Sequence, residues 1–358
     1  METPNLLDLP FEVLDLIFKN LNDFDKWQLA KVNKNLGRAF AFHIRDKYER
    51  VSIHNSSSRF LETILPLCGS TVRHIEATNC FNSYRSLAWL IENNFENLQS
   101  LTIDIDFKKK SYMKRFLRSG VKLQSVEIHV RIDFKFLSKI IGTLMGHPRL
   151  KGLDLYNIYK GLGRLVKQFT DLEVLKLDFS PIQEMINIFE VCVPLNRLRN
   201  LKISSAEIQF IIDDQEFEAL ETIEIKCCFI STKTLPFFKS LKTICFESNF
   251  TYEEMALPWI LKHSNTLENL TTDIRDIHTD DFFKLIKSCR KLRYFYLKVD
   301  IKNLLSTGFI TTFLDILQEN GIDSNNPFQL VTKKITFDAM KSFMPNTPTS
   351  KLLDLYFF

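Results

Sequence analysis

A short apolar pattern recurs along most of the chain and limits it to a repeat architecture. The pattern is apolar-x-x-apolar-x-apolar, and its copies start 21 to 27 residues apart, about 24 on average. One copy cannot cover its own apolar side chains, so neighbouring copies must stack and share a core. The eleven copies are YERVSI from residue 48, VRHIEA from 72, LQSLTI from 98, LQSVEI from 123, LKGLDL from 150, LEVLKL from 172, LRNLKI from 198, LETIEI from 220, LKTICF from 241, LENLTT from 267 and LRYFYL from 292.

Each copy has the alternation of a short strand, and a helical stretch generally follows it. The sequence therefore predicts an α/β fold, an irregular solenoid with a curved parallel sheet inside and helices outside. Two helix stripes illustrate the second half of a unit: Phe134, Leu137, Ile141 and Leu144, and Phe282, Leu285, Ile286 and Cys289.

This section resembles leucine-rich repeats, whose period is 20–29 residues. In such repeats an Asn or Cys two positions beyond the strand bonds the backbone of the adjacent coil. Here Cys80, Cys228 and Asn249 comply and Ser180 could substitute, and the tenth copy ends on Thr272. We therefore expect irregular repeats. The residues at this position that do not fit a buried ladder are Asp106, Arg131, Ile158, Ala206, Arg275 and Asp300.

The stretch of residues 9–40 has more apolar side chains than it can bury by itself. We expect a first helix opened by Pro10 and Glu12, which suit a first turn, and a second helix from about Lys26. Because this hairpin is apolar on more than one face, part of it should contact another protein. The first helix has a stripe of Leu14, Ile17, Phe18 and Leu21 with Phe11, Val13 and Leu16 outside it, and the second has Leu29, Val32, Leu36 and Phe40.

These residues resemble the F-box, the helical module that docks substrate receptors onto the adaptor of SKP–cullin–F-box ubiquitin ligases. Asn33 and Leu36 depart from the family pattern, where Cys and Trp are common. The matching positions are Leu9, Pro10, Glu12, Val13, Leu14, Ile17, Phe18, Leu21, Asp25, Leu29 and Val32. The resemblance implies an adaptor-binding set of Leu9, Pro10, Val13, Leu14, Ile17, Phe18, Leu21 and Val32.

The predicted domains are an F-box-like module at 1–47, the solenoid of about eleven units at 48–299 and an irregular C-terminal cap at 300–358. In the cap we expect a helix from Thr311 to Gln318 closed by Asn320 and Gly321. VTKKITF reads as a strand, and the final LLDLYFF as a buried capping strand, or alternatively as a docking strip for a partner.

Composition and motifs argue against catalysis, metals and cofactors. The 7 cysteines form no Cys-x-x-Cys pair, which favours a reduced protein of the cytoplasm or nucleus. No phosphate loop, nucleophile elbow, dinucleotide turn or spaced histidine pair occurs. Lys108 to Lys110 form the compact basic run, which is too small a face for binding nucleic acid. We expect neither a membrane span nor a secretory signal.

Ligand binding is expected on the concave sheet, where the third, fifth and seventh positions of each unit face solvent. Exposed tyrosine beside a cation is typical of a binding hot spot, so we predict Tyr156, Tyr294, Tyr296 and Lys298 as substrate-binding residues. Alternatively, a C-terminal segment covers the last two tyrosines.

Two functions remain open. The resemblance implies a non-catalytic substrate receptor that binds an SKP-family adaptor, and through it a cullin, and that presents an unknown protein substrate on the repeats. The alternative is an interaction scaffold in which a degenerate F-box acts as a structural cap.

Overall fold

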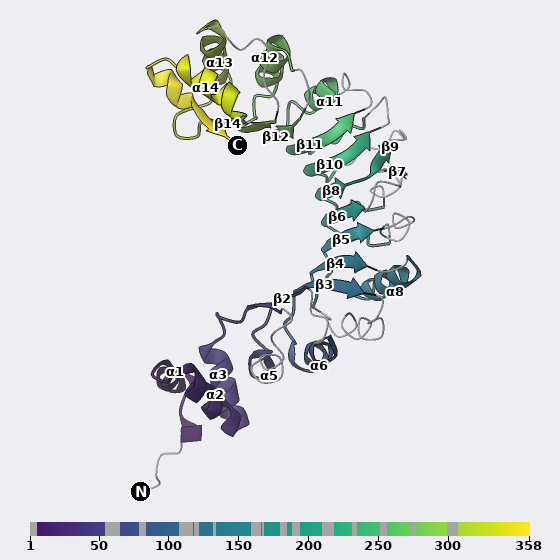
Figure 1. Ribbon diagram of the computed structural model, residues 1–358, viewed down its shortest axis with the longest axis vertical. Helices are drawn as coiled ribbons and strands as arrows, with labels where there is room; N and C mark the ends of the chain where they lie inside the picture. Colours follow the sequence, from purple (N-terminus) through teal and green to yellow (C-terminus); the bar gives the residue numbers. More distant parts are fainter. Residues whose placement is uncertain are drawn as a thin grey trace. The chain divides into compact units, whose positions relative to one another are not determined.

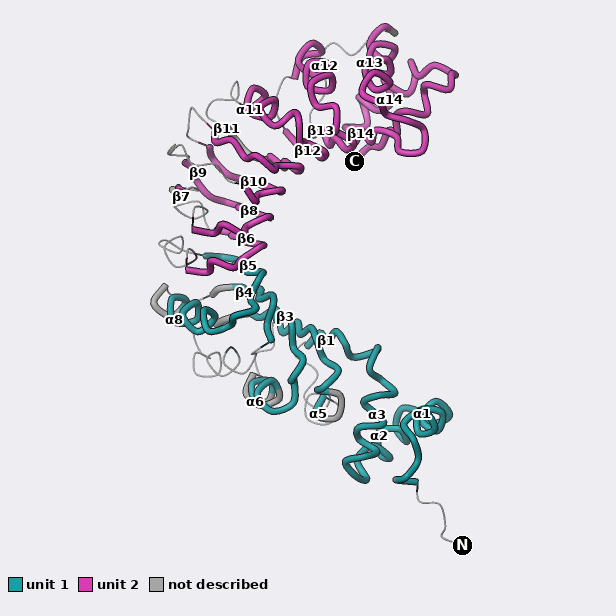
Figure 2. Tube along the Cα trace, turned by 180° about the vertical axis from the view of Figure 1, so that it is seen from behind, with its two compact units in different colours: residues 1–165 teal, residues 166–358 magenta. Residues whose placement is uncertain are grey.

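The computed structural model describes most of the chain, which forms two compact units, residues 1–165 and 166–358 (Figures 1 and 2). Each unit is considered separately below. The described residues are 6–53, 65–78, 84–106, 117, 122–131, 134–158, 166, 168–179, 185–187, 194–209, 218–230, 235–250, 256–273, 277–298 and 307–358.

The first unit opens with a 3-10 turn, η1 (Leu6–Asp8), and three short helices, α1 (Phe11–Lys19), α2 (Asp23–Val32) and α3 (Lys34–His43). The prediction of one long second helix was wrong. The side chain of Asn33 accepts a hydrogen bond from the Leu36 N–H at 2.9 Å, so it caps α3 and separates it from α2. Asn22 caps α2 in the same way.

Five parallel strands follow in the order β1-β2-β3-β4-β5. Their inward residues Val51, Ile75, Leu101, Val126 and Leu153 are paired in register and buried. The remaining elements of this unit are β1 (Arg50–Ser52), α5 (Leu65–Cys68), β2 (His74–Ala77), α6 (Tyr84–Asn94), β3 (Ser100–Asp106), β4 (Ser125–Arg131), α8 (Phe134–Leu144) and β5 (Gly152–Ile158).

The second unit continues the pattern with the order β6-β8-β10-β11-β12-β13-β14-β15, while β7 pairs with β9 and β9 with β10. Its strands are β6 (Val174–Phe179), β7 (Met185–Asn187), β8 (Asn200–Ser204), β9 (Glu207–Gln209), β10 (Thr222–Ile230), β11 (Thr243–Phe250), β12 (Asn269–Thr272), β13 (Tyr294–Leu297), β14 (Phe328–Thr332) and β15 (Leu353–Phe357). Its helices are α11 (Ala256–Lys262), α12 (Thr279–Ser288), α13 (Thr307–Glu319), α14 (Lys334–Ser342) and the 3-10 helix η4 (Pro348–Leu352).

Helices pack on the inward side of these strands. The Phe282 ring of α12 stacks 5.9 Å from Phe295 of β13, and Trp259 of α11 lies 4.9 Å from Phe246 of β11. The predicted stripe of Phe282, Leu285, Ile286 and Cys289 is buried. N-terminal helices followed by parallel strands with helices on one face confirm the α/β repeat solenoid (Figure 1).

The middle repeats differ from the expected strand-helix unit, because short strands β7 and β9 lie in two of the connections. Ser205 and Cys227 adopt positive φ values of 59° and 52°, which turn the chain between successive strand segments. Cys228 does serve the ladder, since its sulfur accepts the Ala206 N–H at 3.4 Å.

The ladder prediction was wrong for Ile158 and Ala206, which are both buried. Both have small or aliphatic side chains, which fill an interior position without a hydrogen bond. Cys80, Ser180, Arg275 and Asp300 lie outside the described residues, as do the side chains of Asp106, Arg131 and Asn249.

The C-terminal segment is more regular than expected. The predicted VTKKITF strand was wrong beyond Thr332, because β14 ends there and α14 begins at Lys334. Gly321, with φ 74°, ends α13 as expected. The last strand β15 pairs with β14, as expected of a capping strand. The prediction that it is buried was wrong for Tyr356, Phe357 and Phe358, which are exposed. The domain boundaries at 47 and 299 stay a prediction.

Candidate functional site

The interior of the three N-terminal helices is built from the regular stripe of α1. Leu14 and Phe18 are buried, and the Phe18 ring lies 5.6 Å from both Phe40 and His43 of α3. Leu14 and Phe18 therefore hold these helices together in this conformation. Their place in the adaptor-binding set stays a prediction.

Several large apolar side chains of the same helices remain exposed. Leu16 of α1 is 57% exposed, and Phe24 and Val32 of α2 are 63% and 68% exposed. Val13 and Phe11 are also exposed. Where such side chains form one contiguous patch, they mark an interaction site. Among the other predicted residues, Pro10 is exposed, whereas Leu9, Ile17 and Leu21 are half-buried. Leu16 and Phe24 were not in the predicted adaptor-binding set.

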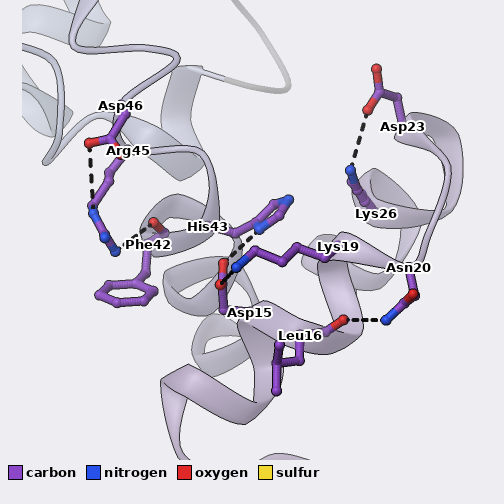
Figure 3. A network of polar contacts seen from close by, with 10 residues as sticks. All are labelled: Asp15, Leu16, Lys19, Asn20, Asp23, Lys26, Phe42, His43, Arg45 and Asp46. Carbon is purple, nitrogen blue, oxygen red and sulfur yellow. Dashed lines mark hydrogen bonds and ion pairs between the residues drawn. The ribbon is translucent and has the colours of Figure 1, made fainter.

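A polar network joins α1 to α3. Figure 3 shows Asp15 between His43 and Lys19, with Leu16 pointing away from them. His43 Nδ1 lies 2.7 Å from Asp15, and Lys19 Nζ lies 2.9 Å from the same carboxylate. The hydrogen bond to His43, followed by that to Lys19, holds the pKa of Asp15 below its usual value.

The segment that forms these helices, which share a core and expose several apolar side chains, matches a known domain family over residues 6–45. Residues 6–45 are an F-box domain. An F-box supports a role in binding the adaptor of a ubiquitin ligase. Within the first unit, helix α3 of the F-box packs against α5 of the repeats. The large apolar side chains exposed on the three helices belong to α1 and α2.

The solved structures that the chain matches are distant in sequence. A chain of the yeast Rad7 and Elc1 complex is 15% identical, with a TM-score of 0.45, and the match covers 90% of this chain and 88% of that one. A chain of the TLR13–ssRNA13 complex is 13% identical, with a TM-score of 0.35, over 79% of this chain. The present chain spans only 37% of the length of that second one. No curated protein matches the chain.

The predicted substrate-binding residues lie on the concave rows of two different units. In the first unit, Tyr156 stacks on His129 with ring centroids 4.6 Å apart, and His129 also lies 3.0 Å from Glu127. In the second unit, Tyr294 and Tyr296 lie half-buried on β13. The ring of Phe358 contacts Tyr296 at 5.0 Å. The end of the chain therefore touches one of the two tyrosines, as the alternative expected.

Lys298 belongs to a row of ion pairs, which we call the ionic row, that the sequence prediction missed. Its Nζ lies 2.6 Å from Glu247, and Lys226 lies 3.6 Å from both Glu247 and Glu224. Lys202 completes the row at 3.5 Å from Glu224. The hydrogen bond to Glu247 raises the pKa of Lys298, so this lysine stays charged. The ionic row crosses β8, β10 and β11 and ends beyond β13.

Several residues expected to face solvent on the concave side are buried instead. These residues are Asp104, Gly152, Asp154 and Cys245.

The described part of the chain holds no group of three or more His, Cys, Asp or Glu residues placed to bind a metal. Of its helices, none is long and apolar enough to cross a bilayer. The basic run at Lys108 to Lys110 lies outside the described residues.

Proposed function

We propose that this chain is the substrate-recognition subunit of a cullin-based ubiquitin ligase. Its F-box binds an adaptor of the SKP family, which connects it to the cullin, and its repeats hold a protein substrate. The observation that carries the proposal is the exposure of the apolar side chains of Val13, Leu16, Phe24 and Val32 on an F-box.

The mechanism is proximity. A substrate bound to the sheet keeps its lysines at high local concentration near the charged conjugating enzyme, so the chain itself performs no chemistry. Tyr156, Tyr294, Tyr296 and Lys298 are the proposed substrate contacts, with the ionic row beside the last two. The free cysteines of the described residues fit a reducing compartment, so we place the protein in the cytoplasm, the nucleus or both.

The alternative is that the F-box only caps the repeats. A cap would turn its apolar surface toward the first repeat, whereas here α3 makes that contact and the exposed residues belong to α1 and α2. Asn33, which motivated this alternative, has a local explanation as the cap of α3. Both observations favour the receptor.

The test is light-scattering chromatography of the chain with a purified SKP-family adaptor at micromolar concentration. We expect a 1:1 complex that the double variant Leu16→Asp, Val32→Asp weakens at least about 100-fold, because the interface would bury two unpaired carboxylates. Both residues are exposed in the free chain, so the F-box should stay folded, as its circular dichroism would show.

The matched control is Ile335→Asp, which places the same charge on α14, at an apolar residue that is 76% exposed. It should bind the adaptor as the unaltered chain does. If the folded, unaltered chain forms no complex with the adaptor, the proposal is wrong and the F-box acts as a structural cap. Equal binding by the double variant would show that the adaptor uses another surface.

A further inference from the structure

The side chains that precede successive strands of the second unit alternate in charge. Glu221 lies 3.8 Å from Arg199 and 3.1 Å from Lys242, so neighbouring coils neutralise each other there. The backbone N–H of each residue in this series donates to the carbonyl of the one before it. The series is Glu173, Arg199, Glu221, Lys242, Glu268 and Arg293.

This balance ends at α11 and α12, whose C-terminal halves carry cations without acidic partners. Five exposed cations lie there, and among the residues that the structure describes none of the five forms an ion pair. The two helices contact each other and follow one another along the same side of the sheet (Figure 1). We call Lys262, Lys284, Lys287, Arg290 and Lys291 the basic patch.

The basic patch is continuous across the two helices. Lys262 and Lys287 hold equivalent places, each five residues before a buried leucine, Leu267 or Leu292. Because β12 and β13 pair in register, these two lysines lie on neighbouring coils. Within α12, Lys284 and Lys287 are one turn apart, on the side opposite the buried residues of that helix.

The helix dipole explains only part of this charge. Lys262 and Lys287 lie in the last turns of α11 and α12, where a cation is favoured. Lys284 lies before that turn. The next helix, α13, packs against α12 and exposes Asp315 and Glu319, neither of which pairs with the basic patch among the described residues. Positive charge is therefore in excess at this surface.

We propose that the basic patch docks an acidic segment of a partner protein. Each cation accepts one carboxylate as its partner, and the spacing of Lys284 and Lys287 matches carboxylates one turn apart on a helix. Charge complementarity selects an anionic partner, because these cations have no acid of their own chain beside them. The basic patch belongs to the second unit, so binding there is measured separately from adaptor binding by the F-box.

The side chains around the basic patch favour a protein over the other common polyanions. Sites for single-stranded nucleic acid add aromatic side chains on which bases stack, and membrane-surface helices add apolar side chains that enter the lipid. No aromatic or large aliphatic side chain of α11 or α12, both described throughout, is exposed. Carboxylates need only the cations that the patch supplies.

A second copy of this chain is the competing occupant, because the sequence contains an acidic stretch of its own. The stretch holds Asp213, Asp214, Glu216 and Glu218. Glu218 already lies 3.8 Å from Lys239 of its own chain, which leaves fewer carboxylates than the patch has cations. Light scattering separates self-association from binding to another protein.

The experiment titrates the full chain into a fluorescein-labelled peptide of glutamate and alanine and follows fluorescence anisotropy at about 50 mM salt. The peptide carries Glu at the i, i+3, i+4 and i+7 positions of a helix, and a second peptide has Gln at each of these positions. We expect saturable binding of the Glu peptide, lost at about 0.5 M salt, and no binding of the Gln peptide.

Three double variants identify the site. Lys287→Glu with Lys291→Glu should weaken binding of the Glu peptide about tenfold or more. Lys341→Glu with Lys351→Glu is the matched control, because it changes the net charge equally at exposed lysines of α14 and η4, and should weaken binding less than about twofold. Lys287→Arg with Lys291→Arg keeps the charge and should retain binding, and thermal unfolding checks that each variant is folded.

Four results would overturn the proposal. The first is no saturable binding of the Glu peptide by the folded, unaltered chain. The second is equal weakening by the two charge-reversing variants, which would make the attraction one of net charge alone. The third is tighter binding of a single-stranded RNA or of phosphatidylserine vesicles that Lys287→Glu with Lys291→Glu abolishes. The fourth is a dimer in light scattering that the same variant dissociates, which would make a second copy the occupant.

Discussion

The imidazole Nδ1 of His43 lies 2.7 Å from a carboxylate oxygen of Asp15, and this contact joins the last helix of the F-box to the first. The two residues are 28 positions apart in the sequence, and the His43 ring also stacks on Phe18. The contact orients α1, and with it the exposed Leu16, which is the next residue of that helix.

Replacing Asp15 by Asn should lower the free energy of unfolding of the F-box by about 1 kcal/mol at pH 7. Since folding lowers the pKa of Asp15, its contribution is complete above the unfolded value of about 3.8. It is lost as the pH falls through the lower folded pKa. Urea unfolding at pH 7 and pH 3 should show a smaller pH effect in the variant. Asp23→Asn, at a carboxylate with 86% exposure, is the control and should change little.

His263 should make the second unit sensitive to mild acid. It is buried, and its Nε2 accepts the Phe238 N–H at 3.1 Å, which requires a neutral ring. Burial, with a smaller effect of Lys262, lowers its pKa from 6.5 to about 4. The unfolded chain therefore binds a proton that the folded chain excludes, and stability falls as the pH drops from about 6.5 toward 4.

At pH 5 the loss should be about 2 kcal/mol relative to neutral pH. Urea unfolding followed by the fluorescence of Trp259, whose ring lies 4.7 Å from His263, would measure it. His263→Gln should reduce this pH dependence, whereas His278→Gln, at an exposed histidine, should preserve it. An unchanged midpoint between pH 7 and pH 5 in the unaltered chain would contradict the prediction.

Two glycines of the first unit should respond oppositely to alanine. A Cβ at Gly69 would lie 2.6 Å from the carbonyl oxygen of Asn94, so Gly69→Ala should destabilise the unit by about 1–3 kcal/mol. At Gly142, inside α8, a Cβ meets nothing within 4 Å, and alanine should stabilise by about 0.5–1 kcal/mol. Thermal unfolding of both variants tests this, and a shift of the same sign in both would refute it.

Adjacent cysteines should differ in reactivity. Cys227 is exposed, whereas burial raises the pKa of Cys228 to about 11. Because the thiolate is the reactive form, a thiol reagent at pH 8 should modify Cys227 first. Cys227→Ser should therefore remove one thiol from the fast phase. Cys228→Ala should leave that phase intact, provided the variant is folded, and loss of the fast phase there would count against the assignment.

The sequence predicted which strand residues face inward and which face solvent, because one apolar pattern determines both the spacing of the strands along the chain and the direction of their side chains. Val51 and Ile223 are inward, and Lys202 and Glu224 outward, as expected. The ionic row was missed because it depends on which residues lie opposite across strands. That relationship becomes visible only when the copies are aligned to one another.

The F-box shows where periodicity misleads. A regular stripe identifies the face that is buried, and in α1 that face, with Leu14 and Phe18, is buried inside the domain itself. The side chains left for a partner, such as Leu16, lie outside the stripe. Asn33 departs from the family pattern. Its side chain favours capping a helix, which predicts the break between α2 and α3.

In the second unit, repeats of different length keep their strands in register, so the residues on the concave surface do not depend on repeat length. Thr222 lies opposite Thr243, 21 positions later, whereas Tyr294 lies opposite Gln329, 35 positions later. In both cases the paired residues hold the same place in their strands. Insertions can therefore accumulate in the connections without altering the concave surface. A single inserted residue within a strand would instead exchange its two faces. Such a molecule can diversify its outer connections freely during evolution and still inherit an unchanged recognition surface.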